Sequence, residues 1–242
     1  MFKKIRYSVA DQIVNKILTS STINRIINYF AAQNIHLQMQ KNALESTARY
    51  VEENMMSAVS FSDLFSLLNF ALSEAKLDGL VMEFGVAGAS TTNFIAKNMM
   101  NKTVHGFDSF EGLPEFWVDN LGGRYEKGTF DSKGKLPTVH ENVQLHVGWF
   151  DKTLPEFVAS HKEDVSFVHI DCDLYSSTKT IFDILSDRIN SGTIIAFNEY
   201  FNYPSWQQHE HKAFQEFVAK NNLKYEYIAY NKVGWEVVVK II

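Results

Sequence analysis

Cysteine is almost absent from this chain of 242 residues, since Cys172 is the only one. A single cysteine excludes an internal disulfide and a zinc–cysteine site, and it is typical of a reducing, cytoplasmic compartment. No apolar run approaches the roughly 18 residues of a membrane span, and the basic start at Lys3, Lys4 and Arg6 lacks the apolar stretch of a signal peptide. We therefore expect a soluble protein that is not processed.

Positive charge is also scarce, because 23 Lys and Arg residues stand against 28 Asp and Glu, a net charge of -5. This balance argues against a nucleic-acid partner. Residues 1–41 differ from the rest, because six basic residues face Asp11 alone there. The apolar spacing within 5–18 and 23–30 predicts two basic amphipathic helices. We interpret 1–75 as a helical segment that acts as a lid, forms a dimer contact or docks on an anionic membrane or a partner.

Hydrophobic residues make up 45% of the chain, which is enough for one sizeable core. Beyond two predicted helices at 43–53 and 61–76, the second capped by Ser60 or Ser62, short apolar runs alternate with helical segments. The strand-like runs are 80–84, 103–107, 142–147, 165–170 and 193–197, and the helical segments are 91–100, 154–160 and 176–185. This alternation predicts an α/β fold with a mostly parallel sheet, and 224–230 with 235–242 predict a terminal antiparallel pair.

A turn with two glycines, Gly85 and Gly88, follows the first of these strands and precedes a helix. Glycines at such a turn let a ligand approach the backbone, and the helix start offers free amide donors. The G-x-x-G spacing is not the dinucleotide fingerprint G-x-G-x-x-G, and glycines that serve only the turn would look the same. Asp108 follows the second strand, where a carboxylate can accept both hydroxyls of a ribose. The two features together predict a nucleoside site.

Five residues stand directly after predicted strands: Gly85, Asp108, Gly148, Asp171 and Asn198. Ligands of open α/β sheets bind beyond the carboxyl ends of the strands, so one pocket can hold all five. No other motif competes well with this interpretation. Tyr-x-x-x-Lys at 175–179 has the spacing of short-chain dehydrogenases, but their glycine-rich turn is missing, as are G-x-S-x-G and H-E-x-x-H.

Carboxylates and an amide gather after the fourth and fifth strands, at Asp171, Asp173, Asn198 and Glu199. Oxygen ligands of this kind suit a hard cation such as magnesium. The alternative is that Asp173 and Glu199 cap helices or pair with Lys and Arg, and that no metal binds. His169 lies inside an apolar run and is predicted to be a core histidine.

Several longer motifs occur in order along the chain: E-F-G-V-A-G-A-S-T-T at 83–92, G-F-D-S-F-E-G-L-P at 106–114, G-W-F-D at 148–151, I-D-C-D-L-Y-S-S-T at 170–178 and N-E-Y-F-N-Y-P at 198–204. With these motifs the chain resembles the class I S-adenosylmethionine-dependent methyltransferases over roughly residues 75–220. More narrowly, it resembles the macrocin O-methyltransferase family, which methylates sugar hydroxyls on natural products. The resemblance implies a Rossmann-like fold with the catalytic domain at 76–242.

The resemblance also implies roles for individual residues. Around the methionine part of S-adenosylmethionine it places Glu83, Gly85, Ser90 and Thr91. At the ribose it places Asp108 with Ser109, and at the adenine Gly148 and Trp149. The aromatic residues that offer a platform for a sugar ring, or belong to the core, are Trp117, Trp149, Tyr200, Tyr203 and Trp206.

The metal and the general base depart from the family pattern. The family holds magnesium with the first aspartate of D-x-D, here Asp171, and with an acidic pair, here Asn198 and Glu199. One charge is lost, so dependence on magnesium is open. The family's proton-accepting aspartate follows that pair, but 200–203 contains no carboxylate. His209 is our candidate for the replacement base, unless it is an ordinary histidine at a helix start.

We therefore expect an O-methyltransferase in which a hydroxyl oxygen attacks the sulfonium methyl group in line, with Asp171 positioning the acceptor. The acceptor is a sugar of a surface glycan or a secondary metabolite, or alternatively a small phenol. Two other functions stay open, a catalytically silent cofactor-binding subunit and a nicotinamide-dependent oxidoreductase. A cytoplasmic homo-oligomer is expected, with the basic arm touching the inner membrane or a glycosyltransferase.

Overall fold

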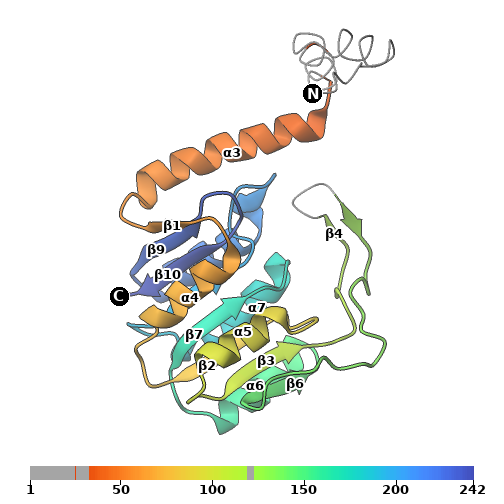
Figure 1. Ribbon diagram of the computed structural model, residues 1–242, viewed down its shortest axis with the longest axis vertical. Helices are drawn as coiled ribbons and strands as arrows, with labels where there is room; N and C mark the ends of the chain where they lie inside the picture. Colours follow the sequence, from red (N-terminus) through yellow and green to blue (C-terminus); the bar gives the residue numbers. More distant parts are fainter. Residues whose placement is uncertain (1–24, 26–32, 119–122) are drawn as a thin grey trace, which may run out of the picture.

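The computed structural model describes residues 25, 33–118 and 123–242 (Figure 1). The two helices predicted in the basic arm, at 5–18 and 23–30, lie outside these residues except for Arg25. The described part contains an eight-stranded sheet of order β1-β9-β10-β8-β7-β2-β3-β6 and a separate two-stranded hairpin, β4-β5. The predicted α/β fold with a mostly parallel sheet is confirmed.

Five parallel strands form the centre of the sheet, and each coincides within a residue of its ends with a predicted run. They are β2 (Leu80–Phe84), β3 (Val104–Asp108), β6 (Val143–Val147), β7 (Val165–Ile170) and β8 (Ile194–Phe197). All residues of β2, β7 and β8 are buried, because helices cover both faces of the sheet. Strand order reverses between β2 and β7, which in open α/β sheets is where ligands bind.

Helices cover both faces of this sheet. On one face, α6 (Phe150–Ser160), α7 (Tyr175–Leu185) and α8 (Glu210–Asn221) bury side chains in the larger apolar cluster. On the other face, α4 (Leu64–Glu74) and α5 (Ser90–Asn98) pack against the smaller cluster. Short 3-10 turns lie at Ser186–Arg188 and Trp206–Gln208. None of the helices in the described ranges combines the length and apolar character needed to cross a membrane.

The C-terminal strands β9 (Tyr225–Asn231) and β10 (Val237–Ile241) form the predicted antiparallel pair, and β10 also pairs antiparallel with β8. A strand that the sequence did not indicate, β1 (Val59–Phe61), adds to the edge of β9 in parallel. Before β1, α3 (Ile35–Asn54) lies across the C-terminal part of the sheet (Figure 1). The first described elements, α3 and β1, thus meet the last strands at one edge of the sheet.

The N-cap of α4 is not at the predicted position. Asp63, rather than Ser60 or Ser62, has the extended backbone of a cap, and its side chain accepts a hydrogen bond of 2.9 Å from the amide of Ser66. Between β3 and β6 the chain makes a long excursion that contains the hairpin of β4 (Trp117–Val118) and β5 (Arg124–Tyr125).

Candidate functional site

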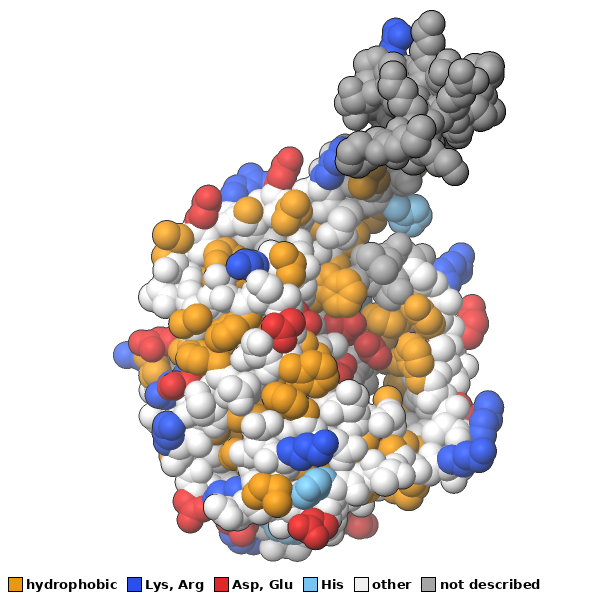
Figure 2. Space-filling model, viewed as in Figure 1, with side chains coloured by type: hydrophobic (Ala, Val, Ile, Leu, Met, Phe, Trp, Pro, Cys, Tyr) orange, Lys and Arg blue, Asp and Glu red, His pale blue; other side chains and the backbone are white. Residues whose placement is uncertain are grey.

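The carboxyl ends of the parallel strands border a cavity of about 1090 Å³. Figure 2 shows a hollow on this face of the molecule, with acidic side chains at its inner edge and apolar side chains around it. The predicted site residues that line the cavity are Gly85, Ser90, Thr91, Asp108, Ser109, Trp149 and Asp171. The predicted site residues that do not line it are Glu83, Gly148, Asn198, Glu199 and His209.

The cavity has further walls that the sequence did not indicate. The excursion after β3 lines one side, with Phe110, Gly112, Leu113, Pro114, Phe130, Ser132, Lys135, Leu136 and Pro137. The start of α4 contributes Leu64 and Phe65, and the start of α7 contributes Ser176, Ser177 and Thr180. Positions 110–114 and 176–177 belong to motifs noted in the sequence, but no role was predicted for them. The remaining lining residues carry no recognisable motif and reach the strand ends through folding of distant segments.

Gly85 follows β2 and lies against the end of β7, the neighbouring strand across the reversal of strand order. Its φ is 93°, in the left-handed region, and a Cβ at this position would lie 1.6 Å from the carbonyl oxygen of Asp171. The ends of β2 and β7 therefore approach each other more closely than any side chain allows. This close approach places the glycine turn and Asp171 in the same cavity.

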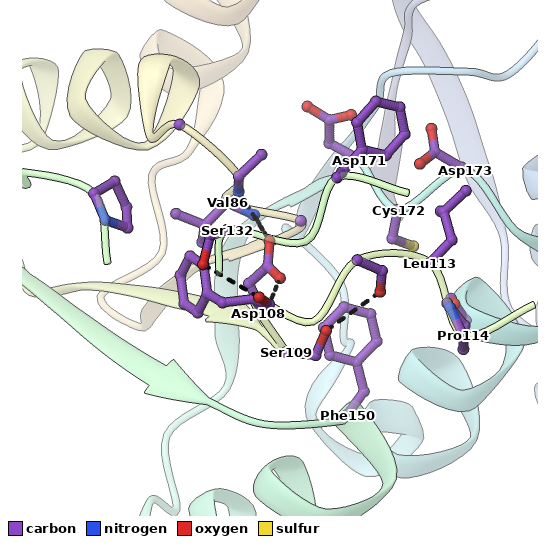
Figure 3. A pocket seen from close by; sticks show the side chains of 18 of the residues that line it. Val86, Asp108, Ser109, Leu113, Pro114, Ser132, Phe150, Asp171, Cys172 and Asp173 are labelled. Atoms are coloured by element: carbon purple, nitrogen blue, oxygen red, sulfur yellow. Dashed lines mark hydrogen bonds between the residues drawn. The ribbon is translucent and has the colours of Figure 1, made fainter. Parts of the chain in front are cut away.

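Asp108 organises the glycine turn from the neighbouring strand. One carboxylate oxygen, Oδ2, accepts hydrogen bonds of 2.8 Å from the amides of Val86 and Ala87, and Oδ1 accepts one of 2.7 Å from the amide of Phe110 (Figure 3). A carboxylate has about four acceptor positions, so about one is left for a ligand. Asp108 lines the cavity as predicted, with room for one ribose hydroxyl rather than two.

Glu83 lies behind the cavity instead of in it. Its carboxyl group is fully buried, accepts a hydrogen bond from the hydroxyl of Thr92 and lies 2.8 Å from Nδ1 of His169. The prediction that His169 belongs to the core is confirmed. Burial is the largest single contribution and lowers the pKa of His169. The hydrogen bond to Glu83 and the negative charge of Glu83 outweigh it, so the pKa of His169 is raised overall. The pair thus ties β2, β7 and α5 together beneath the glycine turn.

The predicted adenine side is brought to the cavity in part. Trp149 lines it at the start of α6, whereas Gly148 does not, because its amide donates to the carbonyl of Asp108, 2.9 Å away. Of the other aromatic residues considered for a sugar platform, Trp117, Tyr200, Tyr203 and Trp206 are buried in the apolar clusters. The alternative that these rings belong to the core is therefore the correct one for them.

Four acidic side chains gather beside the cavity: Asp171, Asp173, Glu199 and Glu210. Asp171 and Asp173 line it, on the side away from Val86 and Ser132 in Figure 3. Burial raises the pKa of Asp171 to about 7, and it raises the pKa values of Asp173, Glu199 and Glu210 as well. Neighbouring negative charges add to this effect. Within the described ranges, no Lys or Arg forms an ion pair with Asp171, Asp173 or Glu210.

Asp173 and Glu199 share a hydrogen bond between their carboxyl groups. This bond lowers the pKa of Asp173 and raises that of Glu199, which repulsion from Asp173 and Glu210 raises further. Burial, the largest cause, raises the pKa of both acids. Of the alternatives raised from the sequence, Glu199 thus has an acidic neighbour, Asp173, as one of its partners.

The predicted magnesium ligands do not form a ready-made metal site. Asp171 and Asn198 lie together, but the amide nitrogen of Asn198 donates to Oδ1 of Asp171 at 3.0 Å, and Glu199 is engaged with Asp173. In the part of the chain that the structure describes, no group of three or more His, Cys, Asp or Glu side chains is placed to hold a metal ion. We therefore derive no chemical step through a metal.

His209, the predicted base, does not face the cavity. It is the N-cap residue of α8, its ring centroid lies 5.7 Å from that of Tyr203, and burial lowers its pKa. Asp173, which the sequence analysis considered as an oxygen ligand for a cation or as a cap or ion-pair partner, is the carboxylate that lines the cavity instead. Its backbone has a φ of 64°, which is uncommon for an aspartate and often occurs at functional sites.

Comparison with known proteins identifies the central part of the chain. Residues 82–200 match the family model described as a methyltransferase domain. The match spans 119 of the 242 residues, which is slightly less than half of the chain. The domain includes the glycine turn, Asp108 and the acidic residues up to Glu199, and it excludes α3, β1, α4 and the C-terminal strands.

Two curated proteins resemble the methyltransferase domain and its surroundings. One, from Streptomyces olivaceus, is the 8-demethyl-8-(2,3-dimethoxy-alpha-L-rhamnosyl)-tetracenomycin-C 4'-O-methyltransferase, 27% identical over 107 residues, which are 38% of this chain. The other, from Streptomyces niveus, is the demethyldecarbamoylnovobiocin O-methyltransferase, 24% identical over 153 residues, which are 57% of this chain. The alignments span only 40% and 56% of these relatives.

Solved structures share the fold over a larger part of the chain. A calicheamicin methyltransferase aligns with a TM-score of 0.56 and 17% identity, over 98% of this chain and 94% of its own. The O-methyltransferase NovP aligns with a TM-score of 0.53 and 21% identity, over 73% of this chain and 78% of its own. These matches identify the fold as that of Rossmann-like methyltransferases.

Proposed function

We propose that the chain is an S-adenosylmethionine-dependent O-methyltransferase that acts on the hydroxyl of a sugar. The observation that carries this proposal is one cavity with two chemically different sides, a glycine turn with Asp108 on one and Asp171 with Asp173 on the other. The methyltransferase-domain match supports methyl transfer over hydride transfer. The names of the two curated relatives support an oxygen acceptor, and one of them names a rhamnosyl substrate.

The glycine-turn side suits the cofactor. Gly88 and the start of α5 bring backbone amides to the cavity, and the N-cap residue Ala89 makes no side-chain hydrogen bond that would occupy them. The amide of Gly85 donates to the carbonyl of Phe107 at 3.0 Å, so this glycine contributes close backbone approach instead. Asp108 retains room for a ribose hydroxyl, and Trp149 borders the region expected for the adenine. The cavity of about 1090 Å³ lies at the upper end of ligand sites, which typically span about 300–1,000 Å³, so a cofactor and an acceptor fit together.

The acidic side suits the acceptor and its proton. In the reaction, an oxygen–carbon bond forms as the sulfur–carbon bond of the methyl donor breaks, and the hydroxyl proton passes to the carboxylate of Asp173. Asp173 can take this proton because its side chain lines the cavity, whereas Glu199 does not line it. Its raised pKa also makes it a stronger base than an exposed aspartate. With a carboxylate available, the silent-subunit alternative loses its main argument.

The lining next to these carboxylates favours a sugar over a phenol. Ser176, Ser177 and Thr180 bring hydroxyl groups from the start of α7, and Leu113 and Pro114 add apolar lining. Ser176 donates to Glu115 at 2.6 Å and Thr180 to the carbonyl of Ser176 at 2.9 Å, so both hydroxyl oxygens can still accept a hydrogen bond. A sugar ring has hydroxyl groups that can donate such bonds and apolar C–H faces, so it suits both kinds of lining.

We propose membership of the narrower macrocin O-methyltransferase family, with magnesium binding that transfer does not require. Asp171 and Asn198 supply oxygen atoms suited to a hard cation, although the third predicted ligand, Glu199, is engaged elsewhere. We expect transfer activity to persist in a metal chelator. Activity that vanishes with chelator and returns with magnesium would instead favour the family's metal-dependent pattern.

The N-terminal arm carries the proposed partner contacts. We propose that residues 1–31 hold the protein at an anionic membrane surface or at a glycosyltransferase, and that the chain forms a homo-oligomer. Deletion of these residues should abolish binding to anionic vesicles. Unchanged binding of the shortened chain would remove the membrane part of the proposal.

The first experiment is a calorimetric titration of S-adenosylhomocysteine into the full chain, with and without magnesium. Micromolar binding that Asp108→Ala weakens at least about tenfold would support the cofactor site. A screen of glycosides and phenols with labelled S-adenosylmethionine then identifies the acceptor class. Folded protein that binds neither the methyl donor nor its product would overturn the proposed function.

A further inference from the structure

The loop that follows β8 and Glu199 is held by a helix from the other end of the described chain. Four side chains of α3 contact the segment from Asn202 to His211, at sequence separations of 155 to 162 residues. The contacting residues are Gln40, Ser46, Thr47 and Tyr50. Gln40, Thr47 and Tyr50 are spaced so that they share one side of the helix.

The contacts at Asn202 involve its backbone. Its amide donates to the hydroxyl of Thr47 at 2.9 Å, and its carbonyl accepts from the side-chain amide of Gln40 at 2.8 Å. Asn202 has a φ of 64°, so the backbone turns sharply there and cannot pair with a regular strand. Thr47 is only 6% exposed, which leaves little water to replace its hydroxyl. α3 therefore supplies both backbone partners of this turn.

The next residue, Tyr203, links the turn at Asn202 to Glu199. Tyr203 is buried beside Asn202, and its hydroxyl donates to the carbonyl of Glu199 at 2.8 Å. Three residues further on, the loop enters the turn that begins at Trp206, whose indole nitrogen donates to the hydroxyl of Ser46 at 3.1 Å. The loop is thus fixed on both sides of Tyr203, and Tyr203 in turn contacts the backbone of the residue that hydrogen-bonds Asp173.

We infer that α3 is part of the catalytic unit, and that Thr47 and Gln40 are positioning residues for the Glu199–Asp173 pair. This inference rests on the proposed function, because it assigns the pair a role in proton transfer. The methyltransferase-domain match, residues 82–200, includes neither α3 nor the turn at Asn202. The domain alone therefore contains the acidic residues without the contacts that hold them in place.

The test uses the full chain with Thr47→Val, which removes the hydroxyl at nearly constant volume, and Gln40→Met as a second variant. Hydrogen exchange of the 198–206 backbone should accelerate at least about tenfold in both, while β7 keeps its protection. The turnover number should fall at least about tenfold, whereas the affinity for S-adenosylhomocysteine stays within about twofold. Thr47→Ser, which keeps the hydroxyl, should restore both properties.

The control is Gln38→Met, because Gln38 is exposed and bonds only Asn42 on the same helix. Exchange of 198–206 that does not change in Thr47→Val and Gln40→Met would overturn the inference whatever the activity. Faster exchange with an unchanged turnover number would overturn it as well. A wild-type chain without methyl transfer would overturn the proposed function, and the exchange experiment would still decide whether α3 positions the loop.

Discussion

Gly85 shows at the scale of one residue how little the site tolerates. Gly85→Ala would force a Cβ to within 1.6 Å of a backbone oxygen at a φ of 93°. We expect the free energy of unfolding to fall by roughly 2–4 kcal/mol, measured by urea denaturation. Gly88→Ala is the matched control, since no atom lies within 4 Å of its added Cβ. An equal loss in both variants would contradict the strand-contact explanation.

Asp173 provides the second prediction at this scale. Asp173→Asn keeps the shape of the side chain but cannot accept a proton, so the turnover number should fall by about 100-fold or more. The affinity for S-adenosylhomocysteine should change little. His209→Gln serves as the comparison, because His209 lies outside the cavity lining. If the histidine variant lost activity and the asparagine variant kept it, the base would be the residue first predicted from the sequence.

Residues whose role depends on strand order alone were predictable from the sequence. Gly85, Asp108 and Asp171 stand directly after apolar runs, and parallel strands present such positions at one edge. The partners of Glu83 and Glu199 were not predictable, because they depend on which distant side chains meet. His169 lies 86 positions from Glu83, and no local pattern signals that contact.

At the scale of elements, the start of α4 positions one wall of the cavity. Asp63 caps this helix, and the next two residues, Leu64 and Phe65, line the cavity. Asp63→Ala should lower the melting temperature by a few degrees, because the amide of Ser66 loses its partner. Ser62→Ala should have no measurable effect. The reverse result in a thermal melt would restore the cap predicted from the sequence.

Elements with a strong apolar pattern were found, and those without one were missed. The five central strands are continuous apolar runs between turn residues, which suffices to locate them. β1 has three residues and no alternation of buried and exposed positions, so only its pairing with β9 defines it. The walls formed by the excursion after β3 were missed for a related reason, since neither helical nor strand periodicity marks that stretch.

At the scale of the whole molecule, the buried acids make stability depend on pH. Burial raises the pKa of Glu210, so the folded chain keeps a proton that the unfolded chain releases above about pH 4.3. This bound proton favours the folded state at low pH. That contribution to the free energy of unfolding is lost as the pH rises toward the pKa of Glu210 in the folded chain. Glu210→Gln should therefore stabilise the protein progressively between about pH 5 and pH 8, measured by thermal melts.

The amide side chain of this variant can still accept the hydrogen bond that Oε2 of Glu210 accepts from the amide of Glu199. Glu226→Gln, on an exposed strand position, should show no such trend. A difference between Glu210→Gln and wild type that is constant across the pH range would show that Glu210 titrates normally in the folded chain.

Three histidines near the other edge of the sheet, His105, His146 and His161, make the folded protein less stable as the pH falls. Nδ1 of His105 lies 3.1 Å from Nε2 of His146, and burial, followed by repulsion from His146 and His161, lowers the pKa of His105 to about 4. The unfolded side chain titrates near 6.5, so stability present above that pH is lost as the pH falls toward 4. His105→Gln should reduce this acid sensitivity in urea denaturation between about pH 6.5 and pH 4.5. If the free energy of unfolding of the variant fell with pH as steeply as that of the wild type, the prediction for His105 would be wrong.

The contacts of α3 and β1 also set an order of events during synthesis. The nascent chain emerges from the ribosome with α3 first, yet Thr47 meets Asn202 across 155 positions and Tyr50 meets Tyr227 across 177. Until β9 is translated, β1 has no strand to pair with, and α3 exposes the side that later holds the loop. We therefore expect α3 and β1 to be accessible to chaperones during translation. The contacts that position the acceptor side of the cavity form only after the C-terminal strands have been translated.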